Sequence, residues 1–210
     1  MRISQLSAAS GVPIPTIKYY LREGLLPQGE QTSATRAEYG EAHLRRLRLI
    51  RALLEVGRLP VASIGKIVAV VEDEEMPVHE MLGTAHYALA SPGESRPDDE
   101  EHHAARERVD TLIDELEWHV HPEAPTREEL AQILVRIDQL GMPASDESMR
   151  HYAGLMMRLV SEHEMGKIPF DGPRETAVES LVIGTVLYGK AFDVLRRLAQ
   201  ESESARILGR

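Results

Sequence analysis

The sequence predicts a mainly α-helical protein in which β structure is confined to one short polar segment near the N-terminus. Apolar residues recur at spacings of three and four along most of the chain, which is the period of a helix with one buried face. Glycine and proline interrupt this pattern and mark where helices end. A hydrophobic content of 42% over 210 residues supports the core of one large domain or two small ones.

Basic and acidic residues are unevenly divided along the chain. The formal net charge is −10. Residues 1–70 hold ten Lys/Arg and five Asp/Glu, a balance of +5, and the remaining residues therefore have a balance of −15. This asymmetry indicates a basic module joined to an acidic one. The basic module can bind nucleic acid locally, while the acidic remainder limits non-specific association.

The chain has no cysteine, so disulfides and thiolate metal sites are excluded. No apolar segment follows Met1 in the manner of a signal peptide. The longest uncharged apolar run, Ser180 to Gly189, is too short to span a bilayer. We therefore expect a soluble, cytoplasmic protein.

The first forty residues predict two short helices joined by a tight turn. Residues 3–10 form the first helix, with Ile3 and Leu6 inward, and Gly11 permits a turn with positive φ. The second helix runs from about Pro15 to Glu23 and ends at Gly24. Two short helices with a glycine turn are typical of a helix-turn-helix.

A polar loop and two more helices complete this module. Residues 27–35 contain glycine and no apolar pattern, and are expected as a loop or a two-stranded wing. A third helix is expected over 40–56 and a fourth over 60–71. The third has an apolar stripe at Leu44, Leu47, Ile50 and Leu54, and a basic face at Arg45, Arg48 and Arg51.

The rest of the chain also reads as helices. They are expected over 77–90, 100–120, 126–141, 146–165 and 173–200. A capping box at Thr126–Glu129 marks the start of the third of these helices. A turn-rich linker is expected over 91–99. The predicted division is a helix-turn-helix domain in 1–70, a connecting helix and linker in 71–99, and an all-helical domain in 100–210.

Cations and tyrosines gather at the second helix and the following loop. Lys18, Tyr19 and Tyr20 lie together on the helix, and Arg36 and Tyr39 close the loop. Cations neutralise phosphates and tyrosine hydroxyls hydrogen-bond to them, which positions a protein on a nucleic-acid backbone without reading its sequence. The alternative interpretation is an ordinary solvated helix face.

The order of residues in this region closely resembles the start of the MerR (mercury-resistance-regulator) family. The matching positions are Ile3, Leu6, Gly11, Val12, Thr16, Ile17, Lys18, Tyr19, Tyr20, Glu23, Gly24, Leu25, Leu26 and Pro27. The resemblance continues through Arg36, Tyr39, Leu44, Leu47, Ile50 and Gly57, and covers about the first 70 residues.

This resemblance implies a winged helix-turn-helix protein that acts as a homodimer on a pseudo-palindromic promoter element. The second helix would enter the major groove with Thr16, Lys18, Tyr19 and Tyr20, and Arg36 would be the wing cation. Tyr39 would either contact the backbone or lie beneath the wing, and Tyr19 would be either a contact or a core residue. Family activators distort the promoter so that RNA polymerase engages it, which makes bound DNA, a second copy and the polymerase the expected partners.

Several positions depart from the family pattern. Pro15 stands where many members have arginine. Lys18 stands where the family motif has another arginine, and a lysine cannot form the two parallel hydrogen bonds that a guanidinium makes to a phosphate. The segment 57–60 is one residue longer than usual, so the junction between the third and fourth helices is expected to differ. Pro92, Gly93 and Pro97 break the long helix that usually forms the dimer, and the last helix is therefore a competing interface.

No metal site or other cofactor is expected. The close histidine groups, His102-His103 and His119-x-His121, lack the spacing of a helical ligand pair. Without cysteine, a soft-metal sensor of the family's thiolate type is excluded. An organic ligand, a partner protein or no effector at all remain open.

Candidates for the lining of a ligand pocket share a large apolar or aromatic side chain in the acidic part of the chain. They are Trp118, Tyr152, Met156, Tyr188 and Phe192. The alternative is that these residues belong to an ordinary helical core. No phosphate loop, nucleophile elbow or metalloprotease motif is present, so we expect no enzyme.

The sequence therefore predicts a bacterial, nucleoid-associated DNA-binding regulator with a non-thiol effector. Two alternatives stay open. One is an effector-free, architectural or excisionase-like DNA-bending protein, and the other is a helical protein-interaction module.

Overall fold

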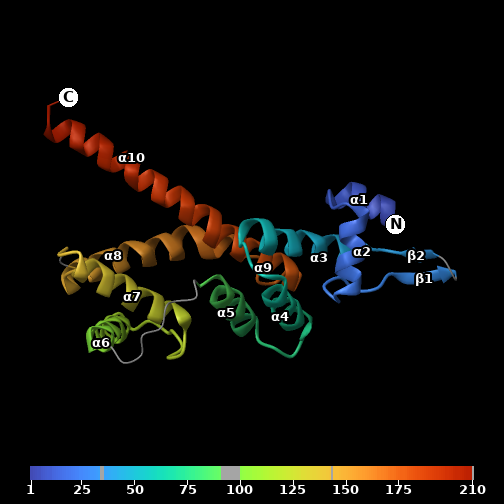
Figure 1. The fold of residues 1–210 in the computed structure, drawn as a ribbon, viewed down its shortest axis with the longest axis horizontal. Coiled ribbons are helices and arrows are strands. Elements are labelled where there is room, and N and C mark those ends of the chain that lie inside the picture. Colours follow the sequence, from blue (N-terminus) through green and yellow to red (C-terminus); the bar gives the residue numbers. More distant parts are fainter. Residues whose placement is uncertain (34–35, 91–99, 143, 210) are drawn as a thin grey trace. The chain divides into compact units, whose positions relative to one another are not determined.

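The computed structural model describes residues 1–33, 36–90, 100–142 and 144–209, and it is mainly helical as predicted (Figure 1). The chain forms two compact units. The first comprises Met1–Ala85 together with Ile168–Arg210, and the second comprises His86–Lys167. The expected linker over 91–99 lies outside the described residues, as does Pro143.

The predicted helix-turn-helix opens the first unit. Helix α1 (Ile3–Ser10) and helix α2 (Ile14–Arg22) are joined by a turn in which Gly11 has φ 70°. This left-handed conformation favours glycine. The Ser7 hydroxyl donates to the Val12 carbonyl at 2.6 Å, and the Val12 N–H donates to the Ser10 hydroxyl at 3.2 Å, which closes the turn.

The predicted wing is present as two short strands. Strand β1 (Glu30–Ser33) pairs antiparallel with strand β2 (Arg36–Glu38). The base of the wing is tied to the start of the chain, because the Met1 amino group donates to the Tyr39 carbonyl at 2.7 Å and the Tyr39 N–H donates to the Met1 carbonyl at 2.8 Å.

The third and fourth predicted helices are α3 (Glu41–Arg51), extended by a π-helical turn over Ala52–Val56, and α4 (Val61–Glu72). The junction between them contains this π-helical turn and Arg58, which has a left-handed φ of 56°. Helix α5 (Val78–Leu89) begins in this unit and reaches the boundary with the second.

The last predicted helix belongs to the first unit. It consists of α9 (Arg174–Ile183), a π-helical turn over Gly184–Tyr188 and α10 (Gly189–Ile207), and so extends past the expected end at 200. Helix α9 packs against α3 and its π-helical turn. Its buried residues are Ala177, Val178, Leu181 and Val182. The expected single domain over 100–210 is therefore wrong in its second half, because this apolar face completes the core of the N-terminal unit.

The second unit is a set of helices around a small core. They are α6 (Glu100–Glu115), α7 (Pro125–Gln139) and α8 (Asp146–Leu159), followed by a π-helical turn over Val160–Glu164 and a short 3-10 helix over Met165–Lys167. The core consists of Ala105, Val109, Ile113, Ala131, Leu134 and Ala144.

Two predicted helix boundaries in this unit are wrong. Helix α6 ends at Glu115 and not at 120, because Glu117 takes a left-handed φ of 55° and the Trp118 N–H bonds back to the Ile113 carbonyl at 3.0 Å. The capping box over 126–129 does not form. Ala124 is the N-cap of α7 without a side-chain hydrogen bond, and Pro125 occupies the first helical turn.

Within the described part of the chain, none of the helices combines the length and apolar character needed to cross a bilayer.

Candidate nucleic-acid interface

Helix α2 turns one face to the core and presents another to solvent. Ile17 and Tyr20 are buried, whereas Lys18 is exposed and Thr16 and Tyr19 are half-buried. Residues three apart lie on the same side of a helix and adjacent residues lie about 100° apart, which explains the division. Of the four predicted α2 contacts, three reach the surface: Thr16, Lys18 and Tyr19.

The fourth, Tyr20, lies in the core with 6% of its surface exposed. Burial raises the pKa of its hydroxyl, and the nearby Glu55 carboxylate adds to this effect. The backbone N–H groups of Leu25 and Leu26 both donate to the Tyr20 carbonyl, at 2.9 and 3.2 Å. The structure therefore gives Tyr20 a positioning role and does not place its ring on the surface with Lys18.

Tyr19 occupies the border between these faces. Its ring centroid is 5.9 Å from that of Tyr20, and the Arg22 guanidinium lies 5.2 Å from the Tyr19 ring centroid. Arg22 in turn pairs with Glu23 at 3.3 Å. One side of Tyr19 thus packs on the helix, and the other stays accessible.

The wing places one cation outward and one aromatic ring inward. Arg36 is exposed at the start of β2. Tyr39 is 7% exposed, and its ring stands edge-on to that of His43 with the centroids 5.1 Å apart. A Cβ at Gly29 would lie 2.7 Å from the Glu38 carbonyl oxygen and 3.0 Å from the Tyr39 ring, so this close approach requires glycine. Tyr39 therefore lies beneath the wing, which was one of its two predicted positions.

The cations of this unit fall into two groups. Among the described residues, neither Lys18 nor Arg36 forms an ion pair. Arg51, by contrast, donates to both carboxylate oxygens of Glu55 at 3.0 Å and to the Ser10 carbonyl at 3.1 Å, which fixes α3 to α1. The hydrogen bond from Arg51 lowers the pKa of Glu55. The predicted basic face of α3 is thus partly structural.

Arg46 is a buried cation that sequence reasoning did not single out. Its side chain is 5% exposed and its guanidinium contacts the carboxylates of Glu72, at 2.7 Å, and Glu175, at 3.6 Å. Arg174 of α9 donates to the carbonyls of Val70, Val71 and Met76, at 3.3, 3.0 and 3.0 Å. Helix α9 is thereby held against α3 and the end of α4. No local pattern signals these partners, because about 100 residues or more separate most of them.

A candidate ligand site lies in the second unit. A cavity of about 360 Å³ opens between α6 and α8. It is lined by Ala104, Glu107, Arg108, Val109, Thr111, Leu112, Glu115, Leu134, Asp146, Met149 and Arg150. Its two arginines are paired: Arg150 binds both carboxylate oxygens of Glu115, at 2.7 and 3.1 Å, and Arg108 contacts Asp146 at 3.1 Å. The cavity therefore has an apolar floor and a polar rim in which both arginines are paired, while the Glu107 carboxylate forms no ion pair among the described residues.

None of the five predicted pocket residues lines this cavity. Trp118 packs against the core of the second unit, whereas Tyr152 and Met156 are exposed on α8. Tyr188 and Phe192 belong to the first unit, where their rings stack with centroids 6.2 Å apart.

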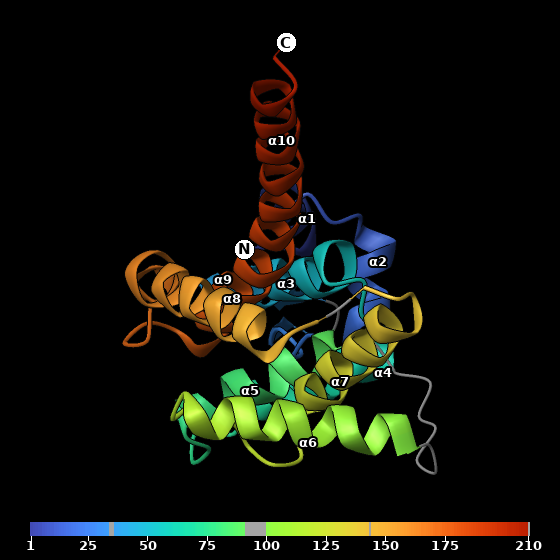
Figure 2. The same cartoon turned by 90° about the vertical axis from the view of Figure 1, so that its left-hand side faces the viewer.

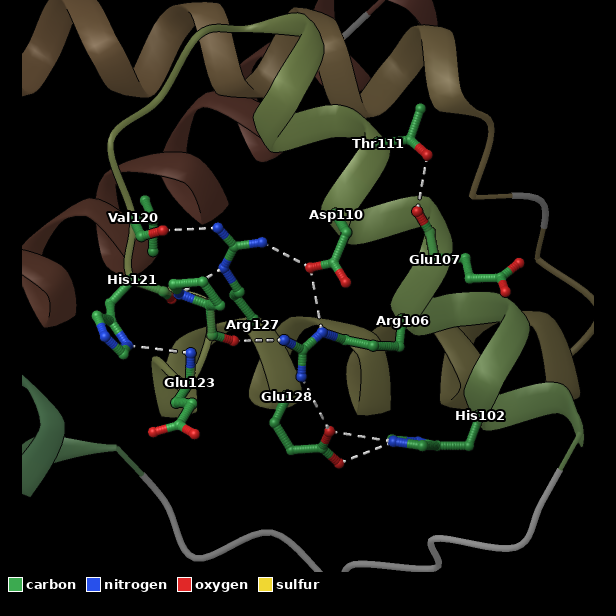
Figure 3. A network of polar contacts seen from close by, with 11 residues as sticks. His102, Arg106, Glu107, Asp110, Thr111, Val120, His121, Glu123, Arg127 and Glu128 are labelled. Atoms are coloured by element: carbon green, nitrogen blue, oxygen red, sulfur yellow. Dashed lines mark hydrogen bonds and ion pairs between the residues drawn. The ribbon is translucent and has the colours of Figure 1, made fainter.

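Histidines and arginines of the second unit form a polar network that joins α6 to α7 (Figure 3). His102 contacts Glu128 at 2.9 Å, and Asp110 accepts hydrogen bonds from Arg106 at 3.2 Å and from Arg127 at 2.7 Å. Burial raises the pKa of Asp110, but the two arginines outweigh it and the net shift is downward. His102 thus serves a structural contact. No metal-binding cluster of three or more side chains is found in the described ranges.

Comparisons with known proteins agree with this geometry. The family described as "MerR HTH family regulatory protein" matches residues 1–70. An "HTH-type transcriptional regulator ZntR homolog" of Haemophilus influenzae is 42% identical over 50 residues, 24% of this chain and 37% of that protein. A "Mercuric resistance operon regulatory protein" of Bacillus cereus is 34% identical over 80 residues, 38% of this chain and 60% of that protein. The chain thus spans less than two thirds of the length of these two relatives.

A solved structure extends the similarity to nearly the full chain. The putative transcriptional regulator SCO5550 from Streptomyces coelicolor A3(2) is 37% identical and has a TM-score of 0.76, over 98% of this chain and 97% of that one. The helix-turn-helix, its wing and these relatives point to one conclusion: the chain belongs to the MerR family of DNA-binding transcriptional regulators and is not an enzyme.

Proposed function

We propose that this regulator binds a pseudo-palindromic promoter element as a homodimer and distorts the DNA. The observation that supports this most strongly is the division of its cations. Lys18 on α2 and Arg36 on the wing are exposed and lack ion pairs among the described residues, while Arg46 and Arg51 behind them are committed to internal contacts. Free cations on a helix-turn-helix and its wing are available to neutralise phosphates.

The proposed contacts divide by element. Thr16, Lys18 and Tyr19 act from α2 in the major groove, and Arg36 acts from the wing on the flanking backbone. Phosphate contacts of this kind fix register and orientation. The buried side chains of Tyr20 and Tyr39 pack beneath α2 and the wing.

Two copies are needed for a two-fold symmetric site, because each copy carries one α2 and one wing. Bending and untwisting the promoter costs a few kcal/mol, which the backbone contacts of both copies offset. The distorted promoter would then be engaged by RNA polymerase in the cytoplasm.

The proposed effector is a small organic molecule whose binding requires no cysteine thiolate. The apolar floor of the α6–α8 cavity, formed by Val109, Leu112, Leu134 and Met149, fits an apolar body. Its rim arginines, Arg108 and Arg150, are already paired, so a neutral or weakly polar ligand would bind without breaking these ion pairs. The absence of any such ligand would favour the effector-free DNA-bending protein.

Footprinting on the DNA upstream of the chain's own coding region tests DNA recognition. We expect one protected site with two-fold symmetry, and a circular-permutation gel should show that it is bent. The double variant K18A/R36A should lose protection. Protection of an asymmetric site, or a footprint unchanged in the double variant, would contradict the proposal.

A thermal-shift screen with a library of neutral organic molecules tests the effector site. A bound ligand raises apparent stability by mass action. Leu112→Trp, which fills the cavity, should remove the shift, whereas Ile133→Trp, at a residue 50% exposed on α7, should leave it unchanged. Loss of the shift in both variants or in neither would contradict the assignment of the cavity.

A further inference from the structure

A second cavity lies beside the candidate ligand site in the second unit. It has a volume of about 310 Å³ and opens between α6 and α7. The candidate ligand site, of about 360 Å³, opens between α6 and α8. Figure 2 shows α6 beneath both of these helices. The two cavities therefore adjoin the same helix, and the residues that they share decide whether one ligand can occupy both.

The two cavities meet at Ala104 and Arg108, which line both of them. These residues are four apart and so lie one turn apart on the same face of α6. On α7, Leu134 lines the first cavity and its neighbour Val135 lines the second. Ala104 is exposed and has only a methyl side chain, so the ridge between the cavities is low at this point. A ligand can therefore extend from one cavity into the other.

The Arg108 side chain is held in a fixed position on this ridge. Its Nε–H donates to Asp146 at 3.1 Å and its Nη1–H donates to Asp138 at 3.0 Å. Its Nη2–H donates to the Ala144 carbonyl. Hydrogen bonds to a guanidinium lie near its plane, so these three fix the plane and leave its faces open.

The open guanidinium face suits an aromatic ring. The Arg108 side chain is 31% exposed, and no aromatic side chain among the described residues stacks on it. A guanidinium is planar and delocalised, and it stacks on the faces of aromatic rings. A flat ring that crosses the ridge would therefore be stabilised there without displacing any partner of Arg108.

The charges of the lining favour an uncharged ring. Five carboxylates and two guanidinium groups line the two cavities together, which disfavours an anionic ligand. The positive charge of Arg108 disfavours a cationic ring stacked directly on it. Among flat aromatic molecules, an uncharged one avoids both repulsions.

We propose that the two cavities form one site for an elongated, flat, uncharged aromatic molecule that crosses the ridge and stacks on Arg108. This assignment rests on the proposed effector site and names the class of its ligand. Ligand pockets span roughly 300–1,000 Å³, and each cavity alone lies at the lower end of that range. Occupation of both cavities accommodates a larger molecule than either one holds.

Nile red is a suitable probe, because it is an elongated, uncharged dye of fused rings that brightens in apolar surroundings. Its Kd for the full-length protein is read from the midpoint of a fluorescence titration. Leu112→Trp fills the first cavity, and Gln139→Trp fills the second from an exposed position. Each should raise the Kd about tenfold or more, because the site then has no room for the whole dye. The control Ile133→Trp, also exposed on α7, should leave the Kd unchanged.

The pattern of these effects separates the joint site from the effector site on which it rests. A Kd that rises in Leu112→Trp but not in Gln139→Trp would overturn the joint site and leave the α6–α8 cavity as the effector site. A Kd that changes in neither variant would contradict the effector site as well.

Two substitutions on the ridge test the crossing and the stack. Ala104→Leu raises the ridge and should raise the Kd about tenfold, whereas Ala191→Leu, at an exposed alanine of α10, should not change it. Arg108→Lys keeps the charge but removes the flat face, and should raise the Kd about fivefold with an unchanged far-UV circular dichroism spectrum. An unchanged Kd in Ala104→Leu would overturn the crossing, and an unchanged Kd in Arg108→Lys would overturn the stack.

Nile blue tests the charge of the ligand, because it shares the ring system of Nile red and is a cation at pH 7. We expect it to bind the wild-type protein more weakly than Nile red. A lower Kd for Nile blue would show that the site selects cations and would overturn the uncharged class.

Discussion

Replacing Val178 by alanine tests whether α9 belongs to the DNA-binding unit. Val178 is fully buried against that unit. The substitution removes two methyl groups, worth about 1.6 kcal/mol in transfer free energy. An unrelaxed cavity of about 50 Å³ would add roughly 1 kcal/mol. We therefore expect a loss of about 1.5 to 3 kcal/mol in the free energy of unfolding of the first unit.

The single tryptophan makes this prediction specific. Trp118 lies in the second unit, so its fluorescence reports that unit, while far-UV circular dichroism reports both. In urea titrations at fixed protein concentration, V178A should shift the dichroism transition and leave the Trp118 transition in place. The reciprocal variant L134A, in the core of the second unit, should shift the Trp118 transition. A V178A variant that moves the Trp118 transition alone would refute the placement of α9.

Two further substitutions, one in each unit, test the stability of the fold. Asp110→Asn should destabilise the second unit at pH 7. The folded-state pKa of Asp110 is lowered below its unfolded value of about 4. Its contribution to stability is therefore present above about pH 4 and is lost as the pH falls through the lower, folded-state pKa. The Trp118 urea midpoints of wild type and variant should converge in acid, and a constant gap would contradict this. In the first unit, Gly11→Ala should lower the free energy of unfolding by about 1 kcal/mol, because Gly11 has a φ of 70°. The control Gly189→Ala, at a helical φ of −54°, should raise it by a few tenths of a kcal/mol. Equal effects of the two variants in urea unfolding would show that φ is not the cause.

The N-terminal fold could be predicted because its signals are local. Gly11 and Gly24 mark the helix ends, and both have a positive φ of about 70°. The polar segment before Arg36 becomes the wing. Each of these features depends on neighbours within a few residues.

The placement of α9 could not be predicted in the same way. Its apolar stripe indicates burial but not the surface that buries it. The contact that identifies this surface joins Arg46 to Glu175. From the sequence alone, an arginine in an arginine-rich helix is expected to keep its charged head in water. The spacing of residues within either segment does not reveal which distant residue completes a long-range ion pair.

The candidate site was predicted in part. Lys18 and Arg36 are exposed as expected, but Tyr20 and Tyr39 lie in the core. A tyrosine has an apolar ring and a polar hydroxyl, so the same residue suits a surface contact or a buried position. Helical phase favours burial for Tyr20, because it lies three residues from the fully buried Ile17.

The salt dependence of DNA affinity tests the central claim most directly, namely that Lys18 contacts the phosphate backbone in both copies of a dimer. Each neutralised phosphate contributes about 0.9 to the slope of log K against log salt concentration. K18A should therefore reduce the magnitude of this slope by about 2 relative to wild type. Arg158→Ala, which removes the same charge from an exposed position on α8, should leave the slope unchanged. A slope in K18A equal to that of the wild type would contradict the account.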